Sequence, residues 1–199
     1  MRNKHARAIG AEYDAWASGR ALEHRCDIGF WTFTKDRFGC DIHISLMPDT
    51  LAKMNWGSFV PFEQGEIKWF DIAVNRDISA LNERLVVIKE LFHVHYDTPG
   101  ERLTSMDVLS HVRSIAIPLS TGQTLPATPA VSNEWDTFFA AIEFIFPHSD
   151  RLVLSSDAAA GVAPIDLPTL VAKYRLDEDL IKLMLEDWAI KEFDPDNEV

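Results

Sequence analysis

The chain has 199 residues, 47% hydrophobic, 11% aromatic and 25% charged, which is typical of a globular protein and excludes intrinsic disorder and low complexity. Its formal net charge of −12 excludes the basic footprint that direct nucleic-acid binding needs, and no apolar run approaches the ~18 residues of a membrane span. Two cysteines are too few for a disulfide framework and no secretory signal is visible, so we expect a cytoplasmic protein with no nucleic-acid or membrane partner.

The first part of the chain combines one helical segment with several short apolar runs. Apolar residues at helical spacing predict an amphipathic helix over Ala6–Arg25. The runs that follow are broken by turn residues and therefore predict strands. These predicted strands cover Ile28–Phe33, Cys40–Ile44, Ser58–Phe62 and Ile67–Val74, with a hairpin turn at Gln64-Gly65 and a short helix over Thr50–Asn55.

The periodicity changes after Asp77. Leu81, Leu85 and Ile88 begin an apolar stripe with three- and four-residue steps, which predicts a buried helix that ends before Pro99-Gly100. The remaining predicted elements are a helix over Ser105–Ile117, a loop over Leu119–Asn133, a helix from near Glu134 to Pro147, a loop over Ser155–Pro164, and helices over Leu167–Tyr174 and Asp177–Lys191 with Leu170, Leu180, Leu183, Met184 and Trp188 as their apolar stripe.

This order of elements predicts an α+β protein with a small sheet early in the chain and helices late. We expect a main domain over residues 1–150 and a helical extension over residues 151–193 that packs on it. Residues 194–199 are predicted to form an acidic tail, because they offer almost nothing to bury.

The buried helix carries a group of ionisable residues near its end. At 100° per residue, Glu90 and Asp97 fall within about 20° of each other, and His93 lies about 40° from Asp97. Lys89 lies on the flank of the same arc, whereas His95 points to the far side. Two carboxylates and an imidazole on one face of a buried helix are costly unless they are paired or bind a metal.

Each of these residues also has a plainer interpretation. His93 fits a hydrogen-bonded histidine of the core, and Glu90 and Lys89 fit a helix face in contact with solvent. Asp97 fits a cap of the following turn. Glu134 fits an acidic residue at a helix N-terminus, where the helix dipole favours it.

Two segments carry a resemblance to a known family. Lys89-Glu90-Leu91-Phe92-His93 resembles a degenerate H-E-x-x-H, in which two histidines bind zinc and the glutamate is the general base. Glu134-Trp135-Asp136-Thr137-Phe138-Phe139-Ala140-Ala141-Ile142-Glu143-Phe144-Ile145-Phe146-Pro147 is similar to the helix E-W-Q-A-N-x-F-A-x-x-L-L-M-P that follows this motif in the ImmA/IrrE (DUF955) family of zinc metallopeptidases. The resemblance covers roughly Ile67–Pro147.

The resemblance implies a zincin-like metallopeptidase fold with a small, mainly antiparallel sheet. It implies zinc as cofactor, Glu90 as the catalytic base, and His93 and Glu134 as zinc ligands. It also implies that the strand ending in Val74-Asn75 lies along the active-site cleft, and that an extended protein segment, such as part of a co-encoded repressor, adds to the edge of this strand. The residues of that strand edge are Ile72, Val74 and Asn75.

One departure leaves three interpretations open. Lys89 stands where the family has its first zinc-binding histidine, and a protonated ammonium has no lone pair to donate. In the first interpretation Lys89 swings aside, and His93, Glu134 and Asp97 hold a divalent metal. In the second, the Lys89 ammonium takes the metal's place and pairs with Glu134 and Glu90 in a catalytically silent pseudo-peptidase. In the third, the resemblance is limited to the fold.

These interpretations predict two kinds of function. With a metal, the protein hydrolyses a peptide bond, and Glu90 takes the proton of the attacking water. Without one, it is an interaction module that binds a regulatory protein in the same cleft. In both cases we expect the side chains of Glu90, His93 and Glu134 to converge.

Overall fold

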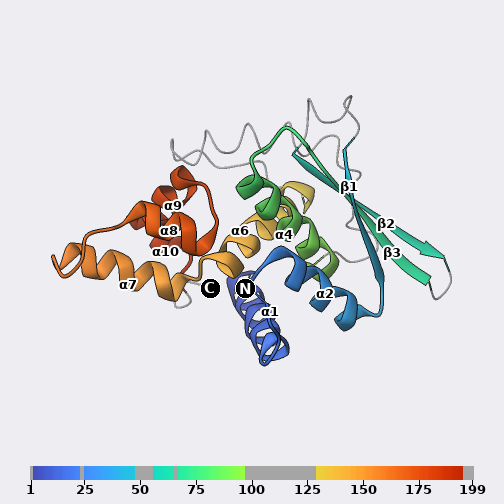
Figure 1. The fold of residues 1–199 in the computed structure, drawn as a ribbon, viewed down its shortest axis with the longest axis horizontal. Coiled ribbons are helices and arrows are strands. Elements are labelled where there is room, and N and C mark those ends of the chain that lie inside the picture. The colour runs from blue at the N-terminus through green and yellow to red at the C-terminus, as the bar shows by residue number, and fades with distance from the viewer. Residues whose placement is uncertain (1, 23–24, 48–55, 65–66, 97–128, 195–199) are drawn as a thin grey trace. The chain divides into compact units, whose positions relative to one another are not determined.

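The computed structural model describes residues 2–22, 25–47, 56–64, 67–96 and 129–194. Within these ranges the protein is α+β, with eight helices and one three-stranded sheet (Figure 1). The chain forms two compact units: Met1–Arg25 with Ala140–Val199 make unit 1, and Cys26–Phe139 make unit 2. Neither unit ends at residue 150, where the sequence predicts a domain boundary. The predicted domains themselves stay a prediction. None of the described helices is long and apolar enough to cross a membrane.

The sheet lies in unit 2 and is mixed. Its strands are β1 (Asp41–Leu46), β2 (Gly57–Gln64) and β3 (Ile67–Val74), in the order β1-β3-β2. β3 is antiparallel to β2, with Gln64 opposite Ile67, and parallel to β1. The predicted strands after Cys40 are therefore confirmed, but the mainly antiparallel sheet is wrong because one of its two pairings is parallel.

Two helices of unit 2 pack on this sheet, α2 (Asp27–Phe38) and α4 (Ala80–Tyr96) (Figure 1). β3 alternates as predicted, since Phe70, Ile72 and Val74 are buried. The α4 helix is confirmed as the buried helix of the sequence, and every residue from Arg84 to Val94 is buried. Polar side chains in this stretch are therefore removed from water and need partners.

The strand predicted over Ile28–Phe33 is wrong, because these residues lie in α2. The Cys26 thiol accepts a hydrogen bond from the Gly29 N–H at the start of the helix, and Gly39, at φ +58°, ends it in the left-handed conformation. Aromatic and β-branched residues favour strands in general. Here Phe30 is fully buried within unit 2, so tertiary packing overrides that local preference.

Unit 1 contains α1 (Arg2–Ala17) and the end of α6 (Pro129–Ile145). The N-terminal helix predicted over Ala6–Arg25 is confirmed, but it begins earlier and ends at Ala17. The α6 helix begins at Pro129 rather than near Glu134, so the predicted loop is wrong over its last residues. Proline suits the first position of a helix because its missing N–H has no partner there.

The rest of unit 1 consists of short helices. The α7 helix (His148–Ala159) extends into the predicted Ser155–Pro164 loop, and α8 (Leu167–Tyr174) has the predicted bounds. The single helix predicted over Asp177–Lys191 is wrong, because α9 (Glu178–Met184) and α10 (Asp187–Glu192) are separate. Leu183 is exposed and does not belong to the buried stripe.

Several predictions lie outside the described residues. These are the turn residue Gly65, the helices over Thr50–Asn55 and Ser105–Ile117, the metal ligand Asp97, and all but the first residue of the tail over 194–199.

Candidate functional site

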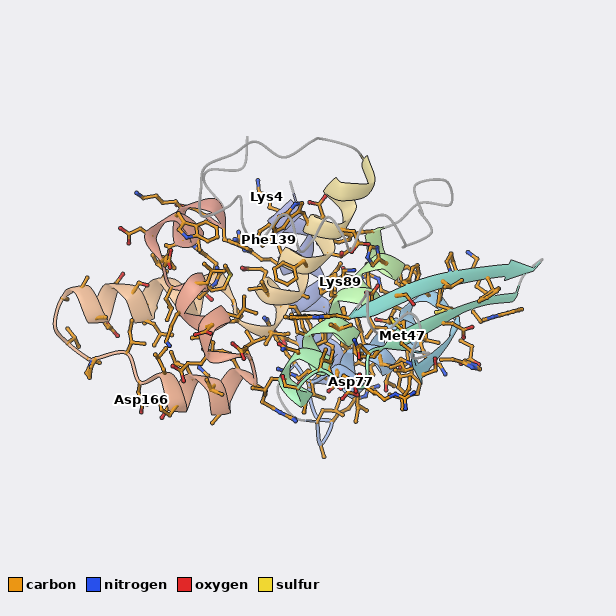
Figure 2. All side chains as sticks on the ribbon, turned by 90° about the horizontal axis from the view of Figure 1, so that it is seen from above. Lys4, Met47, Asp77, Lys89, Phe139 and Asp166 are labelled. Atoms are coloured by element: carbon orange, nitrogen blue, oxygen red, sulfur yellow. The ribbon has the colours of Figure 1, made fainter. Side chains whose placement is uncertain are left out.

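The candidate site is a cluster of charged side chains that joins α4 to the first part of α6, within unit 2. Figure 2 marks Lys89 on α4. Glu90 and His93 lie on the same helix, and Glu134 comes from α6. All four side chains are at most 12% exposed. The interpretation of Lys89 and Glu90 as solvent-facing residues is therefore wrong, and the expected convergence of Glu90, His93 and Glu134 is present.

Lys89 lies between the two carboxylates. Its Nζ is 3.1 Å from Glu90 Oε1 and also forms an ion pair with Glu134 Oε2. Burial by itself lowers the pKa of Lys89, but the charges of Glu90 and Glu134 outweigh this effect and hold the pKa well above its usual range. The side chain is consequently a permanent cation at neutral pH.

His93 completes the cluster from the other side. Its Nε2 lies 3.2 Å from Glu134 Oε1 and 3.8 Å from Glu90 Oε2. The Thr137 hydroxyl donates to the Glu134 carbonyl and lies 3.3 Å from the same His93 nitrogen. The His93 ring also stacks on Phe59 of β2, with 5.6 Å between ring centroids. Its orientation is therefore fixed by both a polar and an aromatic neighbour.

Glu134 is held in its ionised form. Burial by itself raises the pKa of this carboxyl. The positive charge of Lys89 and the hydrogen bond with His93 outweigh burial and lower the pKa to about 2. The cluster therefore carries an ionised Glu134 at any pH near neutrality.

Gly57, at the start of β2, closes the cluster on the sheet side. A Cβ at this position would lie 2.3 Å from Val86 Cγ1 and 2.8 Å from Glu90 Oε1, both too close for a side chain. Only glycine lets β2 approach α4 here. The sequence analysis missed Gly57, Phe59 and Thr137. The one signal in the sequence was Gly57, directly before the strand predicted over Ser58–Phe62.

The structure also places the other residues for which the sequence made a prediction. His95 stays out of the cluster, as predicted, and its Nε2 lies 3.1 Å from Thr34 Oγ1 of α2. The predicted peptide-binding edge is wrong, because β3 is the central strand and both its sides are paired. The residues of that edge, Ile72, Val74 and Asn75, therefore cannot accept an added strand; the Asn75 N–H already donates to the Trp56 carbonyl.

The described residues do not fit the zinc ion that the resemblance implies. Among them, no group of three histidine, cysteine, aspartate or glutamate side chains is arranged to hold a metal ion. Lys89 contacts one oxygen of Glu134, which the resemblance implies as a zinc ligand, and its own ammonium cannot be a ligand.

Comparison with known proteins found no matching family model, no matching curated protein and no matching solved structure. The resemblance to ImmA/IrrE peptidases therefore stays a prediction that rests on the residues quoted above.

Proposed function

We propose that this chain is a cytoplasmic, zincin-like relative of the ImmA/IrrE peptidases that binds a repressor or other regulatory protein without cleaving it. The observation that carries the proposal is the position of the Lys89 ammonium against both Glu90 and Glu134. A general base must be free to take a proton from water. Glu90 is instead 3% exposed and paired with a permanent cation.

The partner segment is proposed to pair with β2. In the described part of the chain, β2 pairs with β3 alone, and no described strand pairs with its other side, where the proposed strand would add. The same strand contributes Gly57 and Phe59 to the charged cluster. A peptide on β2 would therefore run beside the residues that correspond to the active site of the resembled family.

Metal content and cleavage test the absence of catalysis. The purified protein should contain far less than one zinc per chain, and a chelator should leave its melting temperature unchanged. A repressor encoded beside this chain should co-elute with it and keep its intact mass. Near-stoichiometric zinc together with a cleaved repressor would instead support the enzyme, with a metal held by His93, Glu134 and Asp97.

Two matched variants test the binding edge. Val60 on β2 and Ile44 on β1 are similarly exposed, at 40% and 44%. Val60→Lys should weaken the complex with the repressor, whereas Ile44→Lys should leave it unchanged. Equal effects of both variants, or an effect of Ile44→Lys alone, would contradict the β2 edge.

A further inference from the structure

The α7 helix, drawn in orange in Figure 1, presents an exposed face without charge. At 100° per residue, its exposed residues fall within about 120° of one another; they are Ser149, Leu152, Val153, Ser156 and Ala159. Leu152 and Val153 are 46% and 58% exposed. The charged residues of the helix, Asp150, Arg151 and Asp157, lie outside this arc. We call this exposed set the α7 face.

The α7 face differs from the surface of a neighbouring helix in unit 1. The exposed residues of α9 are mostly charged, as is usual where a helix faces water; they are Glu178, Asp179, Lys182 and Leu183. The uncharged surface also continues beyond α7, because every residue from Ala160 to Ile165 is exposed and none is charged. Val162 is 72% exposed and Ile165 is 39% exposed. Exposed apolar residues that adjoin one another in this way mark a surface on which another protein packs.

We propose that the α7 face binds the α7 face of a second copy of this chain, with the two helices antiparallel about a two-fold axis. The inference does not depend on the proposed function. The net charge of −12 opposes the approach of two copies, and this repulsion is weakest where neither surface carries charge. A basic partner would instead gain most at the acidic surfaces of the chain. A second acidic copy therefore suits the α7 face better than a basic protein does.

The charges beside the face favour the antiparallel arrangement. Asp150, near the start of α7, lies 3.6 Å from the ammonium of Lys173, whose side chain is 57% exposed. Asp157 lies two turns later on the same flank, about 20° from Asp150 around the helix, and among the described residues no cation pairs with it. An antiparallel two-fold axis places like flanks side by side and opposite ends together. Lys173 of each copy would therefore lie near Asp157 of the other.

The size of the face sets the strength of the association. Its small residues let two helix backbones approach closely, and Leu152 and Val153 supply the apolar contact. A helix of 12 residues is about 18 Å long, and its face is smaller than the about 800 Å² per partner of a stable complex. We therefore expect a reversible dimer with a dissociation constant on the order of 10–100 μM.

Sedimentation velocity of the full chain, from about 2 to about 500 μM, tests the dimer. The sedimentation coefficient of the parent should rise with concentration toward that of a dimer. Leu152→Glu, which places a charge on the face of each copy, should raise the dissociation constant at least about tenfold. The control is Ile28→Glu on α2, which adds the same charge at a position that is 66% exposed and should leave the dissociation constant unchanged.

Two charge reversals test the antiparallel arrangement. Asp157→Lys and Lys173→Glu should each weaken the dimer about fivefold, because each creates two contacts between like charges across the axis. An equimolar mixture of these two variants should dimerise about as strongly as the parent, because every contact across the axis again joins opposite charges. A mixture that dimerises no better than either variant alone would overturn the inference.

The remaining outcomes also decide the inference. A parent that stays monomeric at the highest concentration overturns it, and so does equal weakening by Leu152→Glu and Ile28→Glu. Circular dichroism checks that each variant is folded. If Leu152→Glu does not fold, Ser156→Glu, at the centre of the face, takes its place, and the parent and the mixed charge reversals decide if neither variant folds.

Discussion

The α6 helix carries two buried glutamates whose surroundings differ. Glu143, in unit 1, accepts hydrogen bonds from the guanidinium groups of Arg7 and Arg151 and from the His148 N–H at the start of α7. Glu134, in unit 2, shares one ammonium with a second carboxylate and otherwise faces His93. Glu143 is thus paired with two guanidinium cations, whereas Glu134 and Glu90 share the single ammonium of Lys89.

This difference separates a structural ion-pair cluster from a candidate site. We call the ion pairs of Glu143 with Arg7 and Arg151 the Glu143 brace. Around Glu143 the positive charge exceeds the negative, and the carboxylate also caps a helix N-terminus, where the dipole favours an anion. Around Glu134, two carboxylates share the one ammonium of Lys89, and the His93 ring faces both of them. The two clusters therefore differ in how much positive charge each carboxylate receives.

The largest effect is expected for Glu143→Gln. Arg151 is fully buried, and the substitution removes the carboxylate that neutralises it. Breaking a buried ion pair in this way costs about 3–5 kcal/mol, and we expect the upper end because Arg7 loses the same partner. Urea unfolding measures the loss. Asp179→Asn, on the exposed surface of α9, is the control and should change stability by less than about 0.5 kcal/mol. A loss for Glu143→Gln as small as that of the control would show that the brace is not structural.

Lys89→Met is expected to follow, with a loss of about 3 kcal/mol. The substitution keeps the aliphatic volume and leaves Glu90 and Glu134 without their ammonium. The loss should be smaller than for Glu143→Gln, because Glu134 keeps His93 as a neighbour, 3.2 Å from its Oε1. Urea unfolding in the presence of a chelator measures it. A loss larger than that of Glu143→Gln would reverse the comparison.

The parts of this fold that follow from local pattern could be predicted. The bounds of β3 and α8 match the sequence analysis because each has a clear period and clear ends: Lys68 is exposed whereas Phe70 and Ile72 are buried, and Asp166 caps α8. The convergence of Glu90 and His93 follows from their spacing on one helix.

The rest depends on contacts between distant segments. The order β1-β3-β2 is set by which strand pairs with β3, and no local pattern encodes that choice. The placement of Phe30 in a helix reflects packing within unit 2 rather than propensity. Gly57 matters because of Val86 and Glu90, which are far from it in sequence. The pairing of β3 on both sides, and the contacts of Phe59 and Thr137 with His93, also join segments that are distant in sequence.

The pH dependence of stability should expose the ionised state of Glu134. Its pKa is about 2 in the folded protein and 4.5 without the fold, so ionisation stabilises the folded state above pH 4.5, and this contribution is lost as the pH falls toward 2. One pKa unit corresponds to about 1.4 kcal/mol, so the contribution is at most about 3.5 kcal/mol, and Lys89 shares part of it. The measurement is the free energy of unfolding of the parent and of Glu134→Gln between neutral pH and pH 2.

Other carboxylates titrate in the same range, but they are common to both proteins, so the difference isolates Glu134. That difference should be largest above pH 4.5 and shrink below it. A difference that stays constant down to pH 2 would mean that Glu134 does not gain stability from its charge, and the contrast with the Glu143 brace would lose its electrostatic basis.

The smallest effect is expected for Thr137→Val. Thr137 is fully buried, and its hydroxyl lies 3.3 Å from His93 Nε2. Valine keeps the shape and removes one hydrogen-bonding group, which costs about 1 kcal/mol. Tyr174→Phe in unit 1, which removes the bond from the Tyr174 hydroxyl to Asp150, should cost a similar amount. Urea unfolding measures both losses. No measurable loss for Thr137→Val would mean that Thr137 only fills space, and that the His93 ring is held by Phe59 and Glu134 without it.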